Sequence, residues 1–448
     1  MIKKIKWNNH ISLGNLELDF KKSDGAVYNT IILAGENGSG KTTILNTLST
    51  FLNGHSMEPF EYIDYDVDNV DYHIVPQKGS AQHGFHIRFF NGNSQGETVR
   101  TSIGINEDIF EKDSKDIRFY GCSYSKARSG FNTQPVKSVT TQQVDVEKYE
   151  PDNQDNFTRI KQLLIDIEQQ DDAAWRKETE QGNISDSVYN SFYTKRSKSF
   201  RFKNAFNSFF VNITFDRIDN NNSQEKTILF KKHGKSIAVD DLSTGEKQIV
   251  FRGAHLLKNI NSISGGIVLI DEPELSMHPM WQKKILNYYR NLFTINGLQT
   301  VQMIMATHSE YVLQSALYDS ENVLIINLSD NQGVIEGKRI APGVLPTITA
   351  AETNYIVFGI LSIDYHIELY GYLQSKEGKH HIKDCDSFIA ASALYDSTKH
   401  SKPDSYNNIK YQTLPTYIRN AIDHPDSGRT YTEKELKTSI ELLIELCR

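Results

Sequence analysis

Apolar residues in this chain form short strand-like runs in some segments and helix-spaced patterns in others, a mixture typical of an α/β protein. The run 267–270 is apolar at every position, as expected of a strand covered on both faces of a sheet. Two further runs, 30–34 and 301–305, also predict strands, and residues 42–51 predict a helix. Strands and helices alternate between residues 265 and 328, which indicates a parallel sheet.

The remaining segments predict three further parts. Residues 55–147 contain strand-like runs such as 84–90 and 117–120. Residues 150–210 predict an inserted helical arm, because four aliphatic residues recur there at helical spacing, namely Ile160, Leu163, Leu164 and Ile167. The tail, 341–448, predicts a small helical bundle with helices near 362–375, 384–396, 414–424 and 433–446. The last of these begins with a capping box at Thr432 and Glu435.

Residues 35–42 read Gly-Glu-Asn-Gly-Ser-Gly-Lys-Thr, a full match to the phosphate-loop pattern G-x-x-x-x-G-K-[ST]. A predicted strand precedes the loop and a predicted helix follows it, which is the context that the motif needs. Glycines let backbone N–H groups surround phosphate oxygens, Lys41 is expected to reach the β- and γ-phosphates, and the Thr42 hydroxyl is expected to bind Mg²⁺. The predicted ATP-binding residues of this segment are Asn37, Gly38, Ser39, Gly40, Lys41, Thr42 and Thr43.

Two acids follow the apolar strand 267–270. Open α/β sheets bind ligands at the carboxyl ends of their strands, so Asp271 is predicted to hold Mg²⁺ through water. Glu272 is predicted to polarise the water that attacks the γ-phosphate. Pro273 stops the strand, which leaves both acids on a loop.

Residues 242–246, Leu-Ser-Thr-Gly-Glu, resemble the signature of ATP-binding-cassette ATPases, with Thr244 in place of the usual second glycine. The resemblance implies that Ser243 and Gly245 contact the γ-phosphate held by a second subunit, so that ATP lies between two heads arranged head to tail. It also implies that His308, which follows the strand 301–305, is a switch histidine at the γ-phosphate, although a lone histidine is more often structural.

The same resemblance implies the fold. We expect an α/β, ATP-binding-cassette-type P-loop head over residues 1–340, with an antiparallel β lobe and the short helical insertion 150–210. Residues 341–448 then form a C-terminal helical domain that docks a partner. The glutamine that senses Mg²⁺ stays open among Gln77, Gln134, Gln142 and Gln143. Arg128 is either a residue that reaches the γ-phosphate or part of a solvated basic loop.

Charge and composition reduce the number of functions that the chain can have. A net charge of −7 argues against coating duplex DNA by bulk charge. The run 195–203 mixes cations with two phenylalanines and suits either single-stranded nucleic acid or the exposed face of an insertion helix. No apolar stretch of about 18 residues and no long apolar leader occurs, so neither a membrane span nor secretion is expected. Scattered cysteines, at 122, 385 and 447, favour a reducing cytoplasm over a disulfide framework.

The tail carries three candidate sites. Asp384-Cys385-Asp386 is its only Asp-x-Asp, but no apolar strand precedes it, which argues against a topoisomerase–primase-type nuclease. His380 and His381 with Asp384 and Cys385 suggest either a metal site or solvated loop residues. Arg419 and His424 resemble the R-N-x-x-x-H motif of the HEPN ribonucleases, and the alternative is an ordinary helix end stopped by Pro425.

Taken together, the motifs resemble the Septu-type, PtuA-like antiphage defence ATPases, some of which are encoded beside retrons. The residues that carry the resemblance are 35–42, 242–246, 271–279, 352–355 and 368–372. It implies a cytoplasmic regulatory ATPase that assembles with a separate HNH nuclease subunit and, in retron-linked members, with a reverse transcriptase and its DNA. Two other functions stay open: an ATP-gated ribonuclease that uses Arg419 and His424, and a DNA-repair ATPase of the RecF type.

Overall fold

The structure, a computed structural model, describes residues 1–90, 93, 95–100, 112–150, 156–180, 182, 185–193, 197–219, 225–406 and 409–448. It divides into two units, Met1–Arg339 and Ile340–Arg448, each with its own core.

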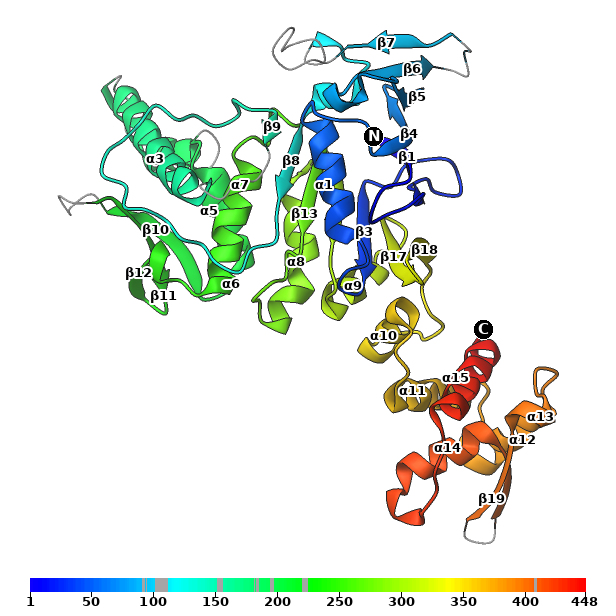
Figure 1. The fold of residues 1–448 in the computed structure, drawn as a ribbon. Coiled ribbons are helices and arrows are strands. Elements are labelled where there is room, and N and C mark those ends of the chain that lie inside the picture. Colours follow the sequence, from blue (N-terminus) through cyan, green and yellow to red (C-terminus); the bar gives the residue numbers. More distant parts are fainter. Residues whose placement is uncertain are drawn as a thin grey trace. The chain divides into compact units, whose positions relative to one another are not determined.

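The first unit is built on a seven-stranded sheet in the order β18-β17-β3-β16-β13-β8-β9 (Figure 1). Its strands are β3 (Thr30–Gly35), β8 (Cys122–Ser125), β9 (Tyr149–Glu150), β13 (Ile267–Asp271), β16 (Gln302–Ala306), β17 (Val323–Asn331) and β18 (Val334–Ile340). Every pair from β17 to β9 is parallel. The three strands predicted at 30–34, 267–270 and 301–305 are therefore confirmed, and so is the parallel sheet.

Both faces of the central strands are covered. Ile31 and Leu33 of β3 share a core with Ile267 and Leu269 of β13 and with α1 (Lys41–Leu52), while the alternate residue Ile32 is equally buried on the opposite face. Helix α9 (Glu310–Leu317) packs against β3 and β17. Because neither face of these strands admits water, the polar side chains of β3, β13 and β16 are confined to the strand ends.

A second, six-stranded sheet confirms the antiparallel lobe. Its order is β2-β1-β4-β5-β6-β7, and all its strand pairs are antiparallel. The strands are β1 (Ile2–Trp7), β2 (Glu17–Asp19), β4 (Phe60–Val67), β5 (Val70–Pro76), β6 (His86–Phe90) and β7 (Glu97–Val99).

One strand prediction in this region is wrong. Residues 117–120 form a 3₁₀ helix, η2 (Ile117–Tyr120), because the Asp116 side chain accepts the Arg118 N–H and caps the turn. The next residues form β8, which joins the parallel sheet beside β13 instead of the lobe.

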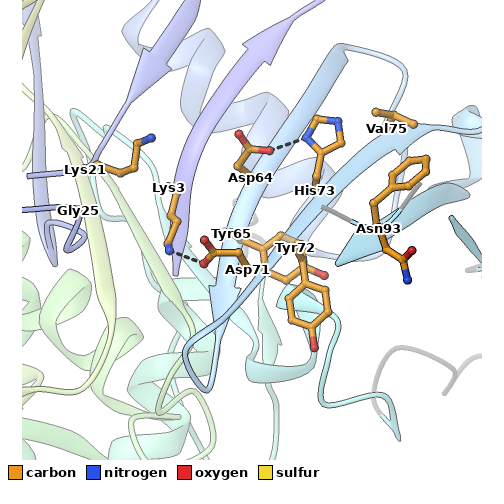
Figure 2. A pocket seen from close by; sticks show the side chains of 11 residues that line it. Lys3, Lys21, Gly25, Asp64, Tyr65, Asp71, Tyr72, His73, Val75 and Asn93 are labelled. Atoms are coloured by element: carbon orange, nitrogen blue, oxygen red, sulfur yellow. Dashed lines mark hydrogen bonds and ion pairs between the residues drawn. The ribbon is translucent and has the colours of Figure 1, made fainter. Parts of the chain in front are cut away.

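A cavity of about 790 Å³ opens on the antiparallel lobe (Figure 2). Its charged side chains pair with one another: Lys3 forms an ion pair with Asp71, and His73 Nδ1 lies 2.6 Å from Asp64 Oδ1. Among the described residues that line it, none belongs to the predicted nucleotide site.

The helical insertion predicted at 150–210 is confirmed over its described residues. It comprises α3 (Asn156–Glu180), α4 (Asp186–Ser191) and α5 (Phe200–Phe209), and the aliphatic face predicted on α3 is buried. A three-stranded sheet of β10 (Ile213–Asp219), β11 (Thr227–Lys232) and β12 (Lys235–Ala238) follows.

The described residues of the basic run 195–203 take part in the packing and ion pairs of the first unit. Phe202 is buried, Arg201 pairs with Asp145 at 2.7 Å and Lys203 pairs with Glu168 at 2.9 Å. The structure thus favours the interpretation of this run as a face of an insertion helix; residues 195 and 196 lie outside the described residues.

The second unit contains all four predicted helices. They are α11 (Ile363–Lys376), α12 (Ile382–Ala391), α14 (Leu414–Asp423) and α15 (Glu433–Cys447), the last with the predicted capping box. The unit also contains a hairpin of β19 (Ser401–Tyr406) and β20 (Ile409–Thr413), which the sequence analysis did not predict. The sequence analysis also missed α10 (Ala350–Phe358) and the short α13 (Ser397–His400).

Asp386 joins the hairpin to helix α12. Its carboxylate, almost fully buried, accepts the Gln412 N–H at 2.9 Å, the Thr413 N–H at 3.0 Å and the Thr413 hydroxyl at 2.7 Å. The Asp-x-Asp segment therefore lies on a helix, and one of its acids is used in folding. The neighbouring Cys385 is buried and free, and no group of three or more metal-ligating side chains occurs in the described part of the chain.

We predict that Asp386→Ala lowers the free energy of unfolding of the second unit by about 3 kcal/mol, because three donors lose their acceptor and two of them are buried. The exposed Asp384 provides the matched control, and Asp384→Ala is expected to leave stability unchanged. Denaturant unfolding followed by circular dichroism measures both. Equal effects of the two substitutions would contradict the structural role of Asp386.

Candidate functional site

The phosphate loop connects β3 to α1 and is shaped by three glycines with positive φ. Gly35, Gly38 and Gly40 have φ values of 143°, 86° and 89°. A β-carbon at Gly35 would lie 2.4 Å from the carbonyl oxygen of Leu328 in the neighbouring strand β17. Glycine is therefore required at position 35 for close packing as well as for backbone conformation.

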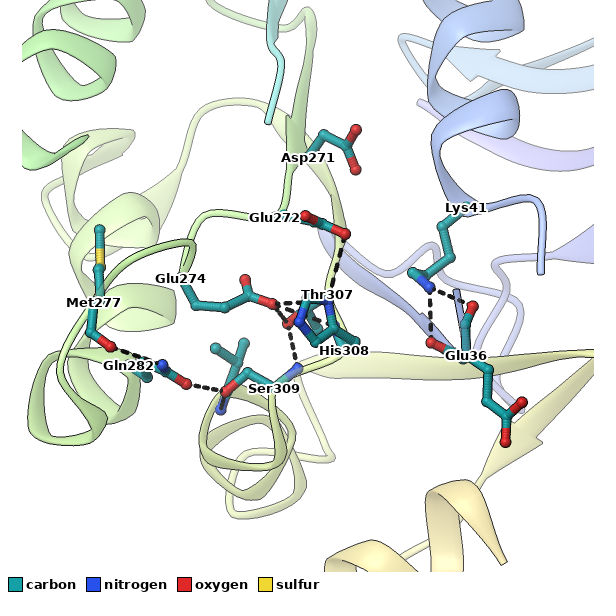
Figure 3. A network of polar contacts seen from close by, with 12 residues as sticks. Glu36, Lys41, Asp271, Glu272, Glu274, Met277, Gln282, Thr307, His308 and Ser309 are labelled. Atoms are coloured by element: carbon teal, nitrogen blue, oxygen red, sulfur yellow. Dashed lines mark hydrogen bonds and ion pairs between the residues drawn. The ribbon is translucent and has the colours of Figure 1, made fainter. Parts of the chain in front are cut away.

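Lys41 folds back over this loop. Its ammonium group donates to the carbonyl oxygens of Gly35 at 2.7 Å and of Glu36 at 2.8 Å, as Figure 3 shows. Burial lowers the pKa of Lys41, and the carboxylates of Glu272 and Asp271 partly offset that shift. The amine is thus held at the inner surface of the loop, where a phosphate oxygen would be a better partner than a carbonyl.

The other predicted loop residues differ in exposure. Asn37, Gly38 and Thr42 are exposed, whereas Gly40 and Thr43 are half-buried. Ser39 is buried, and its Oγ has no hydrogen-bond partner among the described residues. A buried hydroxyl without a partner is uncommon and indicates that a ligand or water completes this loop.

Thr42 and Asp271 meet across the sheet edge. The Thr42 hydroxyl donates to Asp271 Oδ2 at 3.0 Å and lies 3.3 Å from Oδ1. Burial raises the pKa of Asp271, although the hydrogen bond from Thr42 acts in the opposite direction. A hydroxyl and a carboxylate, oxygen groups of the kind that bind Mg²⁺ in proteins, are thereby placed together.

Glu272 and His308 are also brought together. His308 Nδ1 lies 3.4 Å from Glu272 Oε1, and both side chains are partly exposed (Figure 3). The Glu272 N–H donates to the Ala306 carbonyl at 2.9 Å, which ties the loop after β13 to the end of β16. Glu272 itself has a φ of 43°, a left-handed conformation that is uncommon for residues other than glycine.

Glu274 completes this group and was missed by the sequence analysis. Its Oε1 accepts the Thr307 hydroxyl at 2.6 Å and the His308 N–H at 3.2 Å, and it lies 3.8 Å from His308 Nδ1. Burial raises the pKa of Glu274, and the Thr307 hydrogen bond reduces that shift. A third acid so close to the pair 271–272 was the available signal, but the sequence does not show which acids are buried.

The signature segment lies at the start of a helical path. Ser243 caps helix α6 (Thr244–Lys247) in a capping box with Glu246, and Ser243 and Thr244 are exposed. The helical path continues through η5 (Gln248–Arg252) and α7 (Gly253–Leu257), which packs against β8, two strands away from β16 and three from β3. Ser243 and Gly245 make no hydrogen bond to the phosphate loop among the described residues.

Gly245 has a structural use of its own. It is buried, and a β-carbon there would lie 2.8 Å from the carbonyl oxygen of Ser276, in the loop that follows the acids. Because Gly245 has no side chain, the signature helix packs closely against that loop of the same chain. Its predicted contact with a partner's phosphate stays a prediction.

The contacts of the four candidate glutamines and of Arg128 lie elsewhere than at the predicted nucleotide site. The Gln134 N–H donates to the Thr158 hydroxyl at 3.0 Å, and Gln142 and Gln143 line a separate cavity of about 440 Å³. Gln77 packs in the antiparallel lobe. The Arg128 guanidinium stacks 5.1 Å from the Phe157 ring centroid on the insertion. No magnesium-sensing glutamine is assigned.

The candidate ribonuclease pair lies at the end of α14. Arg419 forms an ion pair with Asp423 one turn later, at 2.5 Å. His424 is the residue at which the helix ends. The presence of a β hairpin in this unit separates it from the helical bundles that the motif resembles. The ribonuclease reading stays a prediction.

A parallel sheet with a phosphate loop, two acids and a histidine at one edge, together with an antiparallel lobe and a signature helix, defines an ATP-binding-cassette-type P-loop ATPase head. The chain belongs to the family described as "AAA domain, putative AbiEii toxin, Type IV TA system", whose model matches residues 31–314. Family and fold both imply nucleotide binding.

Named relatives confirm the resemblance to Septu-type and retron-linked ATPases. "Septu protein PtuA" of Bacillus thuringiensis is 23% identical over 328 residues, which cover 70% of this chain and 74% of that protein. "Retron Vc95 probable ATPase" of Vibrio cholerae serotype O1 biovar El Tor is 35% identical over 108 residues, 22% of this chain and 20% of that protein. "Retron Ec83 probable ATPase" of Escherichia coli is 31% identical over 150 residues, 31% of this chain and 25% of that protein. The chain thus spans a quarter or less of the two retron ATPases.

Among solved structures, the SmcHead bound to the C-winged helix domain of ScpA aligns over 76% of this chain and 97% of that chain, with 17% identity and a TM-score of 0.43. This distant likeness adds nothing to the strand order and the family match. In the described residues, every helix is too short or too polar to cross a membrane.

We predict that Glu274→Ala lowers the free energy of unfolding by about 2 kcal/mol, because the buried Thr307 hydroxyl and the His308 N–H lose their acceptor. Glu274→Gln keeps an acceptor oxygen and removes a charge that burial already disfavours, so its stability is expected to stay within about 1 kcal/mol of the wild type. Urea unfolding compares the two. If both variants lost the same stability, the hydrogen-bonding role of Glu274 would be wrong.

Proposed function

We propose that this chain binds and hydrolyses ATP with Mg²⁺ between two copies arranged head to tail, as the regulatory ATPase of a cytoplasmic antiphage defence complex. The observation that carries the proposal is the pairing of Thr42 with Asp271, whose oxygens lie 3.0 Å apart at the carboxyl edge of the sheet. A hydroxyl and a carboxylate are the protein ligands that Mg²⁺ takes in P-loop ATPases.

The residues around this pair fit a nucleotide with its metal ion. Lys41 already lies against the loop carbonyls of Gly35 and Glu36, and Ser39 has a buried hydroxyl without a partner among the described residues. Thr42 and Asp271 would hold Mg²⁺, which would neutralise charge on the phosphate oxygens. Asn37, Gly38, Gly40 and Thr43 would complete the loop around the phosphates.

Glu272 and His308 are proposed to act on the γ-phosphate. The Glu272 carboxylate would orient and polarise the attacking water, since it stands next to the magnesium ligand Asp271. His308 would donate a hydrogen bond to the γ-phosphate, and its Nδ1 faces the carboxylates of Glu272 and Glu274.

Ser243 and Gly245 are proposed to complete the site of a second copy. Ser243 is exposed and begins the helical path whose later part, α7, packs against β8. Because the chain's own phosphate loop is three strands away from β8, a second copy is the natural source of the phosphate for this segment.

The proposal is tested by mixing two inactive variants. Ser243→Asp keeps a good helix N-cap but repels phosphate, and Lys41→Ala removes the phosphate ligand. Each variant alone is expected to lack ATP turnover, whereas a mixture recovers part of it, because one composite site then has an intact Lys41 and an intact Ser243. Phosphate release measures the turnover. A mixture as inactive as its components, or full activity of Ser243→Asp alone, would refute the shared site.

The defence role rests on the named relatives and on the second unit. We propose that Ile340–Arg448 docks a separately encoded HNH nuclease subunit, and that closing of the head pair gates its activity. Two exposed apolar side chains are suited to a protein partner, namely Ile360 in the linker between α10 and α11 and Ile363 at the start of α11. The retron-linked relatives extend the proposal to a reverse transcriptase and its DNA as components that keep the complex inactive.

An HNH subunit encoded beside this chain is expected to co-purify with it. The double variant Ile360→Asp with Ile363→Asp should weaken the complex about tenfold or more, because charges replace the apolar contact. Leu394→Asp, at an equally exposed leucine of the same unit, is the matched control and should bind as the wild type does. Titration by interferometry reports the affinities. Equal binding by all three proteins would exclude this docking surface.

A further inference from the structure

A buried arginine outside every motif holds the loop that carries the two acids. Arg252 ends η5, the π-helical turn that follows the signature helix, and it is 1% exposed. Its guanidinium donates to the carbonyl oxygen of Asp271 at 2.6 Å and to that of Glu272 at 3.0 Å. It also donates to the carbonyl oxygen of Ser125 at 2.9 Å and to the Ser125 hydroxyl at 2.8 Å.

The acceptors around Arg252 are neutral. Its fifth contact, at 3.4 Å, is with the side-chain oxygen of Gln248, and no carboxylate of the described chain forms an ion pair with it. Burying a guanidinium without a counter-ion is unfavourable, and it is tolerated only when several well-placed hydrogen bonds compensate. The other four contacts fix the ends of two adjacent strands, β8 and β13, relative to each other.

The hydrogen bonds from Arg252 hold the backbone at a residue whose conformation is strained. Glu272 has a φ of 43°, and the carbonyls held by Arg252 belong to the two peptide groups that flank this residue. A left-handed conformation at a glutamate persists only when its surroundings enforce it. The Glu272 N–H donates to the Ala306 carbonyl at 2.9 Å, so both flanking peptide planes are fixed and the direction in which the Glu272 side chain leaves the backbone is set.

We infer that Arg252 is a positioning residue for Glu272, and that it links the signature helix to the water-polarising carboxylate of the same chain. The π-helical turn Gln248–Arg252 contains an extra residue and aims the arginine at the strand ends. Gln248 extends the link, since its amide donates to the carbonyl of Arg128 in the segment after β8 at 2.7 Å. This inference rests on the proposed ATPase function.

Arg252→Lys tests the inference, because a single ammonium keeps the charge but cannot span three carbonyls. We expect kcat for ATP to fall about tenfold or more, while the Kd for a fluorescent ATP analogue stays within about threefold, since the phosphate loop is untouched. Ser125→Ala removes one acceptor only and should give a smaller loss of kcat; it replaces Arg252→Lys if that variant fails to fold. Arg118→Lys is the control for loss of a buried arginine: Arg118 is equally buried in the antiparallel lobe, so its substitution should lower the melting temperature and leave kcat unchanged.

The outcomes separate this inference from the proposed function. Wild-type turnover that Glu272→Gln abolishes establishes the function first. Arg252→Lys with wild-type kcat, or with Kd weakened as much as kcat falls, then overturns the positioning role alone. If the wild type does not hydrolyse ATP, the proposed function is wrong, and hydrogen exchange then tests whether Arg252 holds the loop. Faster exchange over residues 272–277 in Arg252→Lys than in Arg118→Lys supports that role, and equal exchange overturns it.

Discussion

Burial of both faces of the parallel sheet is the constraint on which the rest of the head depends. Every residue of β3, β13 and β16 is buried, so polar chemistry begins only where these strands stop. The register pairs Asp271 with Ala306 and Ala306 with Leu33, and it therefore brings the phosphate loop, the acids and His308 to one edge at one level. Without that shared register, these three segments would not form one site.

The site is held in place by polar residues that no motif contains. Glu274 fixes the turn that carries His308, and Arg252 fixes the loop that carries Glu272. Both are ionisable groups at almost fully buried positions, where the loss of hydration is unfavourable unless well-placed hydrogen bonds offset it. The positions of the carboxylates and of the histidine thus depend on hydrogen bonds from residues behind them, as is usual for functional sites.

Several polar and ionisable residues of the second unit make contacts that stabilise its fold. Asp386 secures the hairpin, and Arg419 pairs with Asp423 along a helix. Burial lowers the pKa of His366 to about 3, so this histidine is neutral, and its Nε2 lies 2.8 Å from the Ser439 hydroxyl. The unit thus has its own core, and it exposes two isoleucines, Ile360 before α11 and Ile363 at its first residue.

The sequence by itself determined the parallel strands, the phosphate loop, the helical insertion and the four main tail helices, because periodicity and local motifs specify these features within a few residues. Only the tertiary structure decided that 117–120 is a 3₁₀ turn, that 122–125 joins the parallel sheet and that 401–413 forms a hairpin. It alone revealed Glu274 and Arg252, whose partners lie up to 127 positions away along the chain. Such contacts depend on which distant backbone groups need a hydrogen-bond partner after burial, and a linear pattern of residues does not contain that information.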